Sequence, residues 1–225
     1  MVINENTLRI LKSFNSINSS IAIEAGNQLR TVHEQRTILG SAKLDQEFPQ
    51  DFAIYDLGQF LSTLNLVDEP RITYDQEYLT IQDMSGRTKI KYYYADSNTV
   101  QKAQEVQFPV PFATATIDRT SLNKLIKAAG TFGYEHFTMT PGTGGSVVLT
   151  LLDPADSTSN EFSIVVDADV AEGANFEVIY KVSNLKMIEG DYRVELARGA
   201  SQWTKVDEDL VYFVVIEGNS TYEGV

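Results

Sequence analysis

The sequence predicts an α+β protein whose two halves share one order of elements. Three segments place apolar residues at helical spacing behind a residue that can cap a helix. Between them lie many short runs rich in β-branched and aromatic residues, bounded by turn residues such as glycine and asparagine. Because the connections between these runs are short, we expect neighbouring strands to pair antiparallel, with helices covering one face of the sheets.

The first half contains two predicted helices. Residues 7–17 form the first helix, with Asn6 as its expected N-cap, and residues 57–66 form the second, with Asp56 as its cap. The apolar stripe of the first helix comprises Leu8, Ile10, Leu11, Phe14 and Ile17. Strands are expected over residues 20–25, 28–32, 37–44, 52–55, 71–74, 78–83 and 88–94, with a hairpin turn at Ser85-Gly86.

The second half repeats this order after one additional strand. Asp118 is expected to cap a helix over residues 119–129, which Gly130 ends, and a short fourth helix is expected near residues 181–187. The tail from residue 218 onward is polar and expected to be loose. Strands are expected over residues 113–117, 134–140, 146–152, 161–167, 176–180, 191–198, 201–206 and 210–217.

Residues 95–111 separate the two halves. They are polar at first and end with two prolines around one residue, Pro109 and Pro111, which favours an extended path. We therefore predict one domain over residues 1–107, including most of this connector, and a second over residues 108–225. The shared order of elements indicates a weak internal duplication. Three residue pairs repeat at one offset: Phe52/Phe176, Ile54/Val178 and Leu61/Leu185.

The composition excludes several kinds of site. The 225 residues include no cysteine, which excludes disulfides, zinc–thiolate sites, iron–sulfur clusters and cysteine nucleophiles. The chain has no apolar run of the length that spans a membrane, and its N-terminus lacks the apolar stretch of a signal peptide. The net charge of −13 would repel phosphate unless the basic residues gather on one surface.

Basic residues do gather on the predicted helices. The segments 7–17, 119–130 and 181–188 contain no Asp or Glu, although about one residue in seven of the whole chain is acidic. Such a partition suits contact with the DNA backbone, which reads no base sequence. Lysines opposite an apolar stripe are also what an ordinary solvated helix face shows, so composition alone leaves both interpretations open. The basic residues of these segments are Arg9, Lys12, Arg119, Lys124, Lys127, Lys181 and Lys186.

The whole chain resembles the sliding clamps of T-even-type bacteriophages and of their cyanobacterial-phage relatives. No catalytic signature carries the resemblance, which lies in the order and spacing of segments from end to end. These segments are LKSFNSINSSI (11–21), FAIYDLGQFLSTLNLV (52–67), IKYYYADSNTV (90–100), FPVPFA (108–113) and VSNLKMIEGDYRVEL (182–196).

The resemblance implies a DNA-clamp fold and a function without catalysis or cofactors. In such clamps three identical two-domain subunits form a ring, with antiparallel sheets outside and helices lining a central hole that holds duplex DNA. The implied partners are a clamp-loader ATPase, the C-terminal peptide of the phage DNA polymerase, and a late sigma-like factor with its coactivator. The implied location is the cytoplasm of the infected bacterium, with no membrane association.

The resemblance also assigns roles to residues of this sequence. The seven basic residues of the predicted helices would face the hole, whereas helix 57–66 has no basic residue, so DNA contact would be uneven around the ring. A groove for partner peptides would lie near the connector and the last long strand. Its candidate residues are Ile38, Phe108, Pro109, Val215 and Ile216.

Other residue clusters have ordinary structural interpretations. His33 and His136 lack the spacing of a metal pair, and the glycine-rich segment 141–145 lacks the Gly-Lys-Ser/Thr ending of a phosphate loop. The pairs Asp167/Asp169 and Asp207/Asp209 lack the glycine of a calcium loop, so no metal site is expected. Tyr92, Tyr93 and Tyr94 are expected to alternate between the faces of a strand, as packing residues more than as base-stacking ones.

Two competing functions remain compatible with the sequence. An acidic α+β structural or assembly protein of a virion would need neither basic helices nor an active site. A hydrolase with paired carboxylates would need two acids converging in a cleft, and no acid of this sequence has a persuasive partner.

Overall fold

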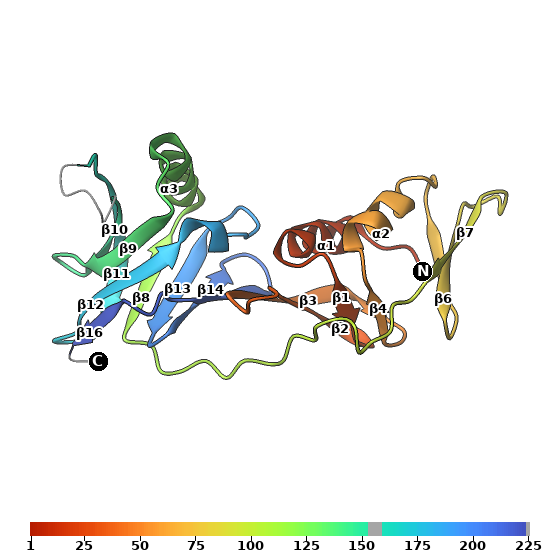
Figure 1. Ribbon diagram of the computed structural model, residues 1–225, viewed down its shortest axis with the longest axis horizontal. Helices are drawn as coiled ribbons and strands as arrows, with labels where there is room; N and C mark the ends of the chain where they lie inside the picture. The colour runs from red at the N-terminus through yellow and green to blue at the C-terminus, as the bar shows by residue number, and fades with distance from the viewer. Residues whose placement is uncertain (153–158, 224–225) are drawn as a thin grey trace. The chain divides into compact units, whose positions relative to one another are not determined.

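The computed structural model describes residues 1–152 and 159–223 and divides the chain into two compact units (Figure 1). Unit 1 spans Met1–Glu105 and unit 2 spans Val106–Val225. The boundary expected from the sequence lies two residues further along the chain. Each unit combines helices with antiparallel strands, so the predicted α+β class is confirmed.

Unit 1 consists of two helices and seven strands. All of its strand pairs are antiparallel: β1 with β4, β2 with β3, and β5 with β6 and then β7. Helices α1 and α2 pack against each other and lie on the same side of the strands (Figure 1). The elements are α1 (Glu5–Ile17), β1 (Ile21–Ile23), β2 (Gly26–Val32), β3 (Ile38–Phe48), β4 (Phe52–Ile54), α2 (Leu57–Leu64), β5 (Arg71–Tyr74), β6 (Tyr78–Gln82) and β7 (Lys89–Tyr93).

Unit 2 is built around one sheet with the strand order β16-β12-β9-β10-β11-β8-β13-β14-β15, all antiparallel. Helix α3 packs against β10 and β11. The elements are β8 (Ala113–Ile117), α3 (Arg119–Phe132), β9 (His136–Pro141), β10 (Ser146–Leu151), β11 (Phe162–Val170), β12 (Asn175–Lys181), η1 (Val182–Asn184), β13 (Tyr192–Ala197), β14 (Ala200–Lys205), β15 (Leu210–Val215) and β16 (Thr221–Glu223).

The pairing pattern of unit 1 recurs in unit 2. The pairs β1·β4 and β2·β3 correspond to β9·β12 and β10·β11, and the meander β5-β6-β7 corresponds to β13-β14-β15. The counterpart of strand β8, which pairs with β13, is Met1. Its amino group donates to the Ile72 carbonyl at 2.6 Å and its carbonyl accepts from the Ile72 N–H at 2.7 Å.

The core of unit 2 is rich in large aromatic side chains. Trp203 is fully buried, with Tyr180 and Tyr192 at ring distances of 6.3 and 6.2 Å. Its indole N–H donates to the Ser201 hydroxyl at 2.8 Å, which satisfies the one polar atom of its side chain. The sequence had given no role to this tryptophan, which the structure places in the packing of the sheet.

Two predicted helix ends are wrong. Helix α1 begins at Glu5, because the side chain of Asn4, not that of Asn6, accepts from the Thr7 N–H at 2.7 Å. Helix α3 continues through Gly130 to Phe132 and ends at Gly133, whose φ of 74° is a left-handed conformation that glycine adopts without strain.

The predicted fourth helix is also wrong. Only Val182–Asn184 forms a helical turn, a 3₁₀ turn that follows directly on β12. The backbone after it is held by two buried tyrosines: the Tyr192 hydroxyl donates to the Ile188 carbonyl, and the Ile188 N–H donates to the Tyr212 hydroxyl at 3.2 Å. A backbone fixed in this way cannot supply the hydrogen bonds of a helix.

The C-terminal tail is not loose up to Glu223. Residues Thr221–Glu223 form β16 along the edge of β12, with Tyr222 opposite Phe176. The Tyr222 ring also packs against Phe112 at 5.7 Å, so an aromatic contact holds a segment that looked too polar to be ordered.

Candidate nucleic-acid interface

Helix α1 carries the first two predicted DNA-facing residues. Its buried stripe of Thr7, Ile10, Leu11, Phe14 and Ile17 turns Lys12 to solvent and leaves Arg9 partly exposed. The Arg9 guanidinium donates to the Asn6 side-chain oxygen at 2.8 Å, one turn away. Because the helix begins at Glu5, it is not free of acid, although Glu5 lies at the N-terminal end, where a negative charge is favourable.

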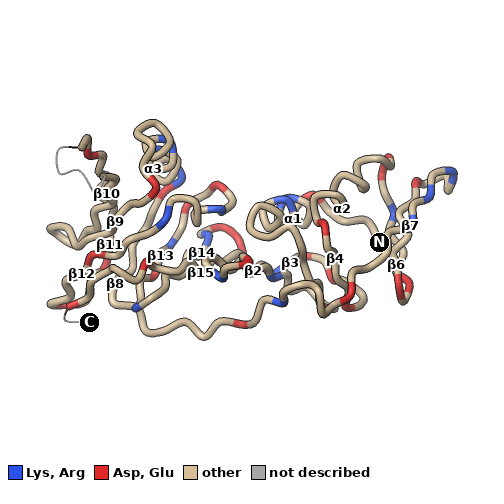
Figure 2. The backbone as a smooth tube through the Cα atoms, in the orientation of Figure 1, with Lys and Arg blue, Asp and Glu red and all other residues tan. Residues whose placement is uncertain are grey.

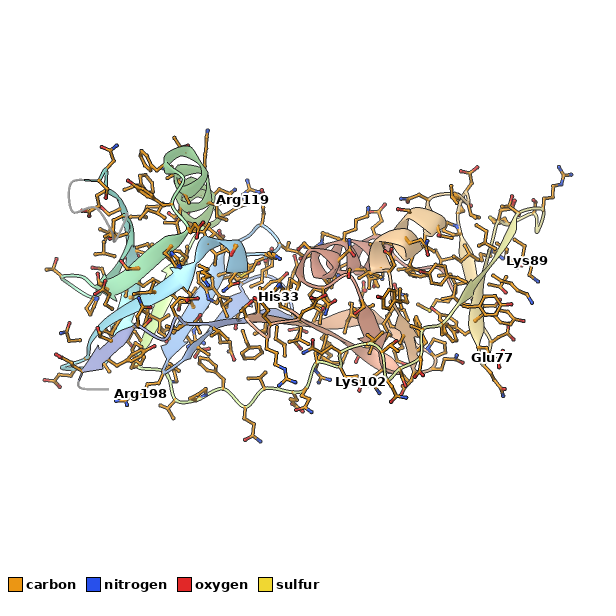
Figure 3. All side chains as sticks on the ribbon, viewed as in Figure 1. His33, Glu77, Lys89, Lys102, Arg119 and Arg198 are labelled. Atoms are coloured by element: carbon orange, nitrogen blue, oxygen red, sulfur yellow. The ribbon has the colours of Figure 1, made fainter. Side chains whose placement is uncertain are left out.

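Helix α3 carries three more of these residues. The Asp118 carboxylate accepts from the Ser121 N–H at 3.0 Å, which confirms the predicted cap. Leu122, Leu125 and Ala129 are buried against the sheet, so Arg119, Lys124 and Lys127 are exposed to solvent. Among the described residues none of these three side chains has an ion-pair partner. Figure 2 shows the basic residues along α1 and α3, and Figure 3 labels Arg119.

The last two predicted residues do not lie on a helix. Lys181 ends β12 and forms an ion pair with Glu217 at 3.8 Å, and Lys186 is half-buried in the irregular segment after η1. Lys181 nevertheless lies beside α3, because it lines with Ile126 and Gly130 a hollow of about 580 Å³ between that helix and the end of β12. The structure therefore brings Lys181 to the basic helix of unit 2.

This hollow also explains an exposed apolar residue. Ile126 lies on α3 beside the buried Leu125, and 38% of it is exposed. In unit 1 the corresponding helix α1 packs against α2. In unit 2 the short turn η1 stands where a second helix would be, so one flank of α3 stays uncovered.

The predicted groove residues differ in accessibility. Ile38 and Ile216 are buried, with 1% and 4% of their surface exposed, whereas Pro109 is exposed and 40% of Val215 is accessible. Within unit 2, Phe108 packs its ring at 6.1 Å from that of Phe213 on β15. The accessible members are therefore Phe108, Pro109 and Val215.

Comparisons with known proteins match the chain from end to end. A family model described as DNA polymerase processivity factor matches residues 4–101. The sliding clamp of Vibrio phage KVP40 is 30% identical over 224 residues, which cover 96% of this chain and 99% of that protein. The chain belongs to the sliding clamp family.

Further relatives agree with this membership. The sliding clamp of Escherichia phage RB69 is 28% identical over 229 residues, covering 99% of this chain and all of the relative. Among solved structures, the proliferating cellular nuclear antigen of Entamoeba histolytica superposes with a TM-score of 0.69 at 10% identity, covering 93% and 94% of the two chains. This likeness shows the predicted clamp fold, and the predicted resemblance to phage sliding clamps is confirmed.

The other residue clusters noted in the sequence of this clamp lie in turns or pack against neighbouring aromatic side chains. The His33 ring nitrogen lies 3.2 Å from the Thr37 hydroxyl in the turn between β2 and β3, and residues 141–145 form the turn between β9 and β10. The side chains of Tyr92 and Tyr94 pack on Phe60 and Phe52, whereas Tyr93 lies on the opposite, exposed face of β7.

Within residues 1–152 and 159–223, no three histidine or acidic side chains converge as a metal site would require. In the same residues, no helix is both long and apolar enough to cross a membrane.

Sequence reasoning missed the charge of two strands. Residues 86–94, which include β7, contain three basic residues and no acid, whereas residues 161–170, which include β11, contain three acids and no base. The signal was present in the sequence. The structure shows that β7 is an edge strand and that residues 162–167 of β11 pair with β10 alone among the described residues.

Proposed function

We propose that the chain is one subunit of a homotrimeric ring that encircles duplex DNA and tethers the phage polymerase for processive synthesis. The observation that carries the proposal is the end-to-end match to phage sliding clamps, in an acidic chain whose helices α1 and α3 carry accessible basic residues. In this proposal the two units are the two clamp domains of each subunit, and α1 and α3 line the hole.

The basic helices suit a clamp that must hold DNA and still slide along it. Long, flexible lysine side chains attract phosphates without reading bases. Each side chain can therefore move from one phosphate to the next as the protein slides. Lys12, Lys124 and Lys127 can act in this way because no acid in the described residues pairs with them. The acid on the other surfaces discourages unproductive binding outside the ring.

The proposal assigns no catalytic residue and no cofactor to the chain. Loading onto DNA falls to a clamp-loader ATPase, and the polymerase docks by its C-terminal peptide on the surface around Phe108, Pro109 and Val215. Exposed apolar residues beside a proline-stiffened connector suit a short peptide with apolar anchors. The chain would also act as a coactivator of late transcription, whose protein partners would bind the same docking surface. Both roles belong to the cytoplasm of the infected bacterium.

Charge reversal on α3 tests this function. Lys124→Glu with Lys127→Glu should lower processive synthesis by the phage polymerase by roughly tenfold, because cationic contacts to the DNA backbone become repulsive. The matched control is Arg71→Glu with Lys102→Glu, which changes the net charge equally at exposed residues outside the helices. Equal processivity in the two variants would remove α3 from the DNA interface. A wild-type protein without any effect on the polymerase would instead favour a virion protein.

A further inference from the structure

The segment after β15 covers one edge of the unit 2 sheet. Residues 221–223 form β16, which pairs with residues 175–177 of β12 on the edge opposite β9 (Figure 1). Thr221 and Glu223 are exposed, whereas Tyr222 is half-buried. The apolar anchor of this short strand is therefore the ring of Tyr222.

Tyr222 occupies an aromatic site. Its ring lies 5.7 Å from that of Phe112, which in turn lies 4.9 Å from the ring of Phe176 on β12. The backbone of Phe112 is held on both sides, because its N–H donates to the Leu196 carbonyl at 2.8 Å and its carbonyl accepts from the Ala171 N–H at 2.9 Å. The two phenylalanines therefore form a fixed apolar surface on which one further ring packs.

This aromatic site adjoins the proposed docking surface. The Tyr222 hydroxyl accepts from the Gly199 N–H at 3.4 Å, and the Gly199 carbonyl accepts from the Ile216 N–H at 3.1 Å. Ile216 directly follows Val215, an accessible member of the docking surface. The Tyr222 ring also packs on Phe112 at the end of the connector, whose preceding residues supply the other members of that surface. Tyr222 is therefore linked to the docking surface along β15 and along the connector.

Unit 1 leaves the corresponding edge without a covering strand. Phe52 of β4 corresponds to Phe176 of β12 by the internal offset. Among the described residues, the edge of β4 opposite β1 makes one backbone hydrogen bond, from the Ala95 N–H to the Ala53 carbonyl at 2.9 Å. A hollow of about 450 Å³ lies beside this edge, and Phe52, Ala53 and Tyr94 are among its lining residues. The fold therefore tolerates this edge uncovered, and an uncovered edge can add an extended peptide.

We propose that residues 220–223, here called the β16 segment, are a displaceable occupant of a peptide site. The polymerase peptide takes their place: its backbone pairs with β12, and one of its large apolar side chains enters the position of Tyr222. This inference rests on the proposed function, because its ligand is the peptide assigned to the docking surface. Since the β16 segment and the peptide compete for one site, the apparent affinity is lowered to the fraction of clamps whose site is free.

A disulfide lock tests the displacement. The chain has no cysteine, so Asn175→Cys with Glu223→Cys, which lie opposite each other in the β12–β16 pair, adds a single disulfide that holds the β16 segment in place. The oxidised variant should bind a fluorescent peptide with the C-terminal sequence of the polymerase roughly tenfold or more weakly than the wild type, and reduction should restore the affinity. The matched control is Arg71→Cys with Gln82→Cys, which lie opposite each other in unit 1 and should bind equally in both redox states.

Releasing the β16 segment should have the opposite effect. Tyr222→Ala removes the ring that anchors it, so the same peptide should bind roughly threefold to tenfold more tightly. Tyr55→Ala is the control, because this tyrosine of unit 1 is 70% exposed and should leave the affinity unchanged. In the wild-type protein, addition of the peptide should speed hydrogen exchange at the amides of residues 221–223, whose strand is then displaced.

The outcomes separate this inference from the proposed function. Absence of peptide binding by the wild type and by every variant would overturn the proposed docking of the polymerase. Peptide binding of equal strength in the oxidised and reduced lock, or no gain in affinity in Tyr222→Ala, would overturn only the displacement of the β16 segment.

Discussion

Lys205 is a charged residue in the interior of unit 2. Only 5% of its side chain is exposed, and its ammonium group donates to Asp207 and to Glu208, the latter at 3.1 Å. Burial by itself would lower the pKa of this lysine, but the hydrogen bonds to the two carboxylates outweigh it and raise the pKa. Displacing this ammonium group is costly, because it would break the hydrogen bonds to both carboxylates and leave a buried charge without partners.

Gly190 leaves the space that Lys205 needs. A Cβ atom at Gly190 would lie 2.6 Å from Cε and 2.8 Å from Nζ of Lys205. We expect Gly190→Ala to lower the free energy of unfolding by about 1–3 kcal/mol, as overpacking does. Urea denaturation measures the change, with Gly218→Ala as the control, since no atom lies within 4 Å of that Cβ. Equal stability of the two variants would contradict the contact.

Asp118 should titrate below the usual range of an aspartate. Hydrogen bonds from the Ser121 hydroxyl and N–H lower the pKa of its carboxyl. Because the folded pKa is depressed, this cap stabilises α3 above the unfolded pKa of about 3.9, and the contribution is lost as pH falls through the folded pKa. Ser121→Ala should raise the Asp118 pKa in an NMR titration. An unchanged pKa would mean that the side-chain hydrogen bond is not formed in solution.

At this scale the sequence predicted most caps but not all of them. Asp56 and Asp118 each stand alone before an apolar stripe, and the structure confirms both as caps. Asn4 and Asn6 are both suitable before α1, and only the extended backbone at Asn4 decides between them. Backbone conformation of this kind depends on the neighbouring strands, which a sequence pattern does not contain.

Helix α3 shows how an element's end is decided. Gly130 lies inside the helix with open space around its Cβ position, whereas Gly133 holds the left-handed conformation that ends it. Gly130→Ala should therefore raise the free energy of unfolding by about 0.5–1 kcal/mol, and Gly133→Ala should lower it by about 1 kcal/mol. Thermal and urea denaturation of the pair measure the signs. The reverse order would place the end of the helix at Gly130.

The second helix of unit 2 could not be excluded from its sequence. Residues near 181–187 match those of α2 by the internal offset, and the strand before them was predicted within one or two residues. What prevents the helix is the pair of hydrogen bonds between the Ile188 backbone and the hydroxyls of Tyr192 and Tyr212, the second of which joins residues 24 positions apart. Local periodicity carries no information about such a contact.

For the whole molecule, the sequence predicted the α+β class and, apart from the fourth helix, the repeated order of elements, because strand alternation and the helical spacing of apolar residues are present in each half. It did not predict which strand edges stay open, since this depends on how far β8 runs along β11. The basic segments were visible in the sequence as stretches without acidic residues, whereas the edge position of β7 required the pairing pattern.

The central claim is that the ring holds DNA by enclosing it and not by tight contacts. It is tested most directly by loading the protein with the proposed clamp-loader ATPase onto nicked circular DNA and isolating the complex by gel filtration in moderate salt. We expect the protein to stay with the circles and to be lost once a restriction enzyme linearises them, because a ring slides off free ends. Equal retention on circular and linear DNA would contradict the account.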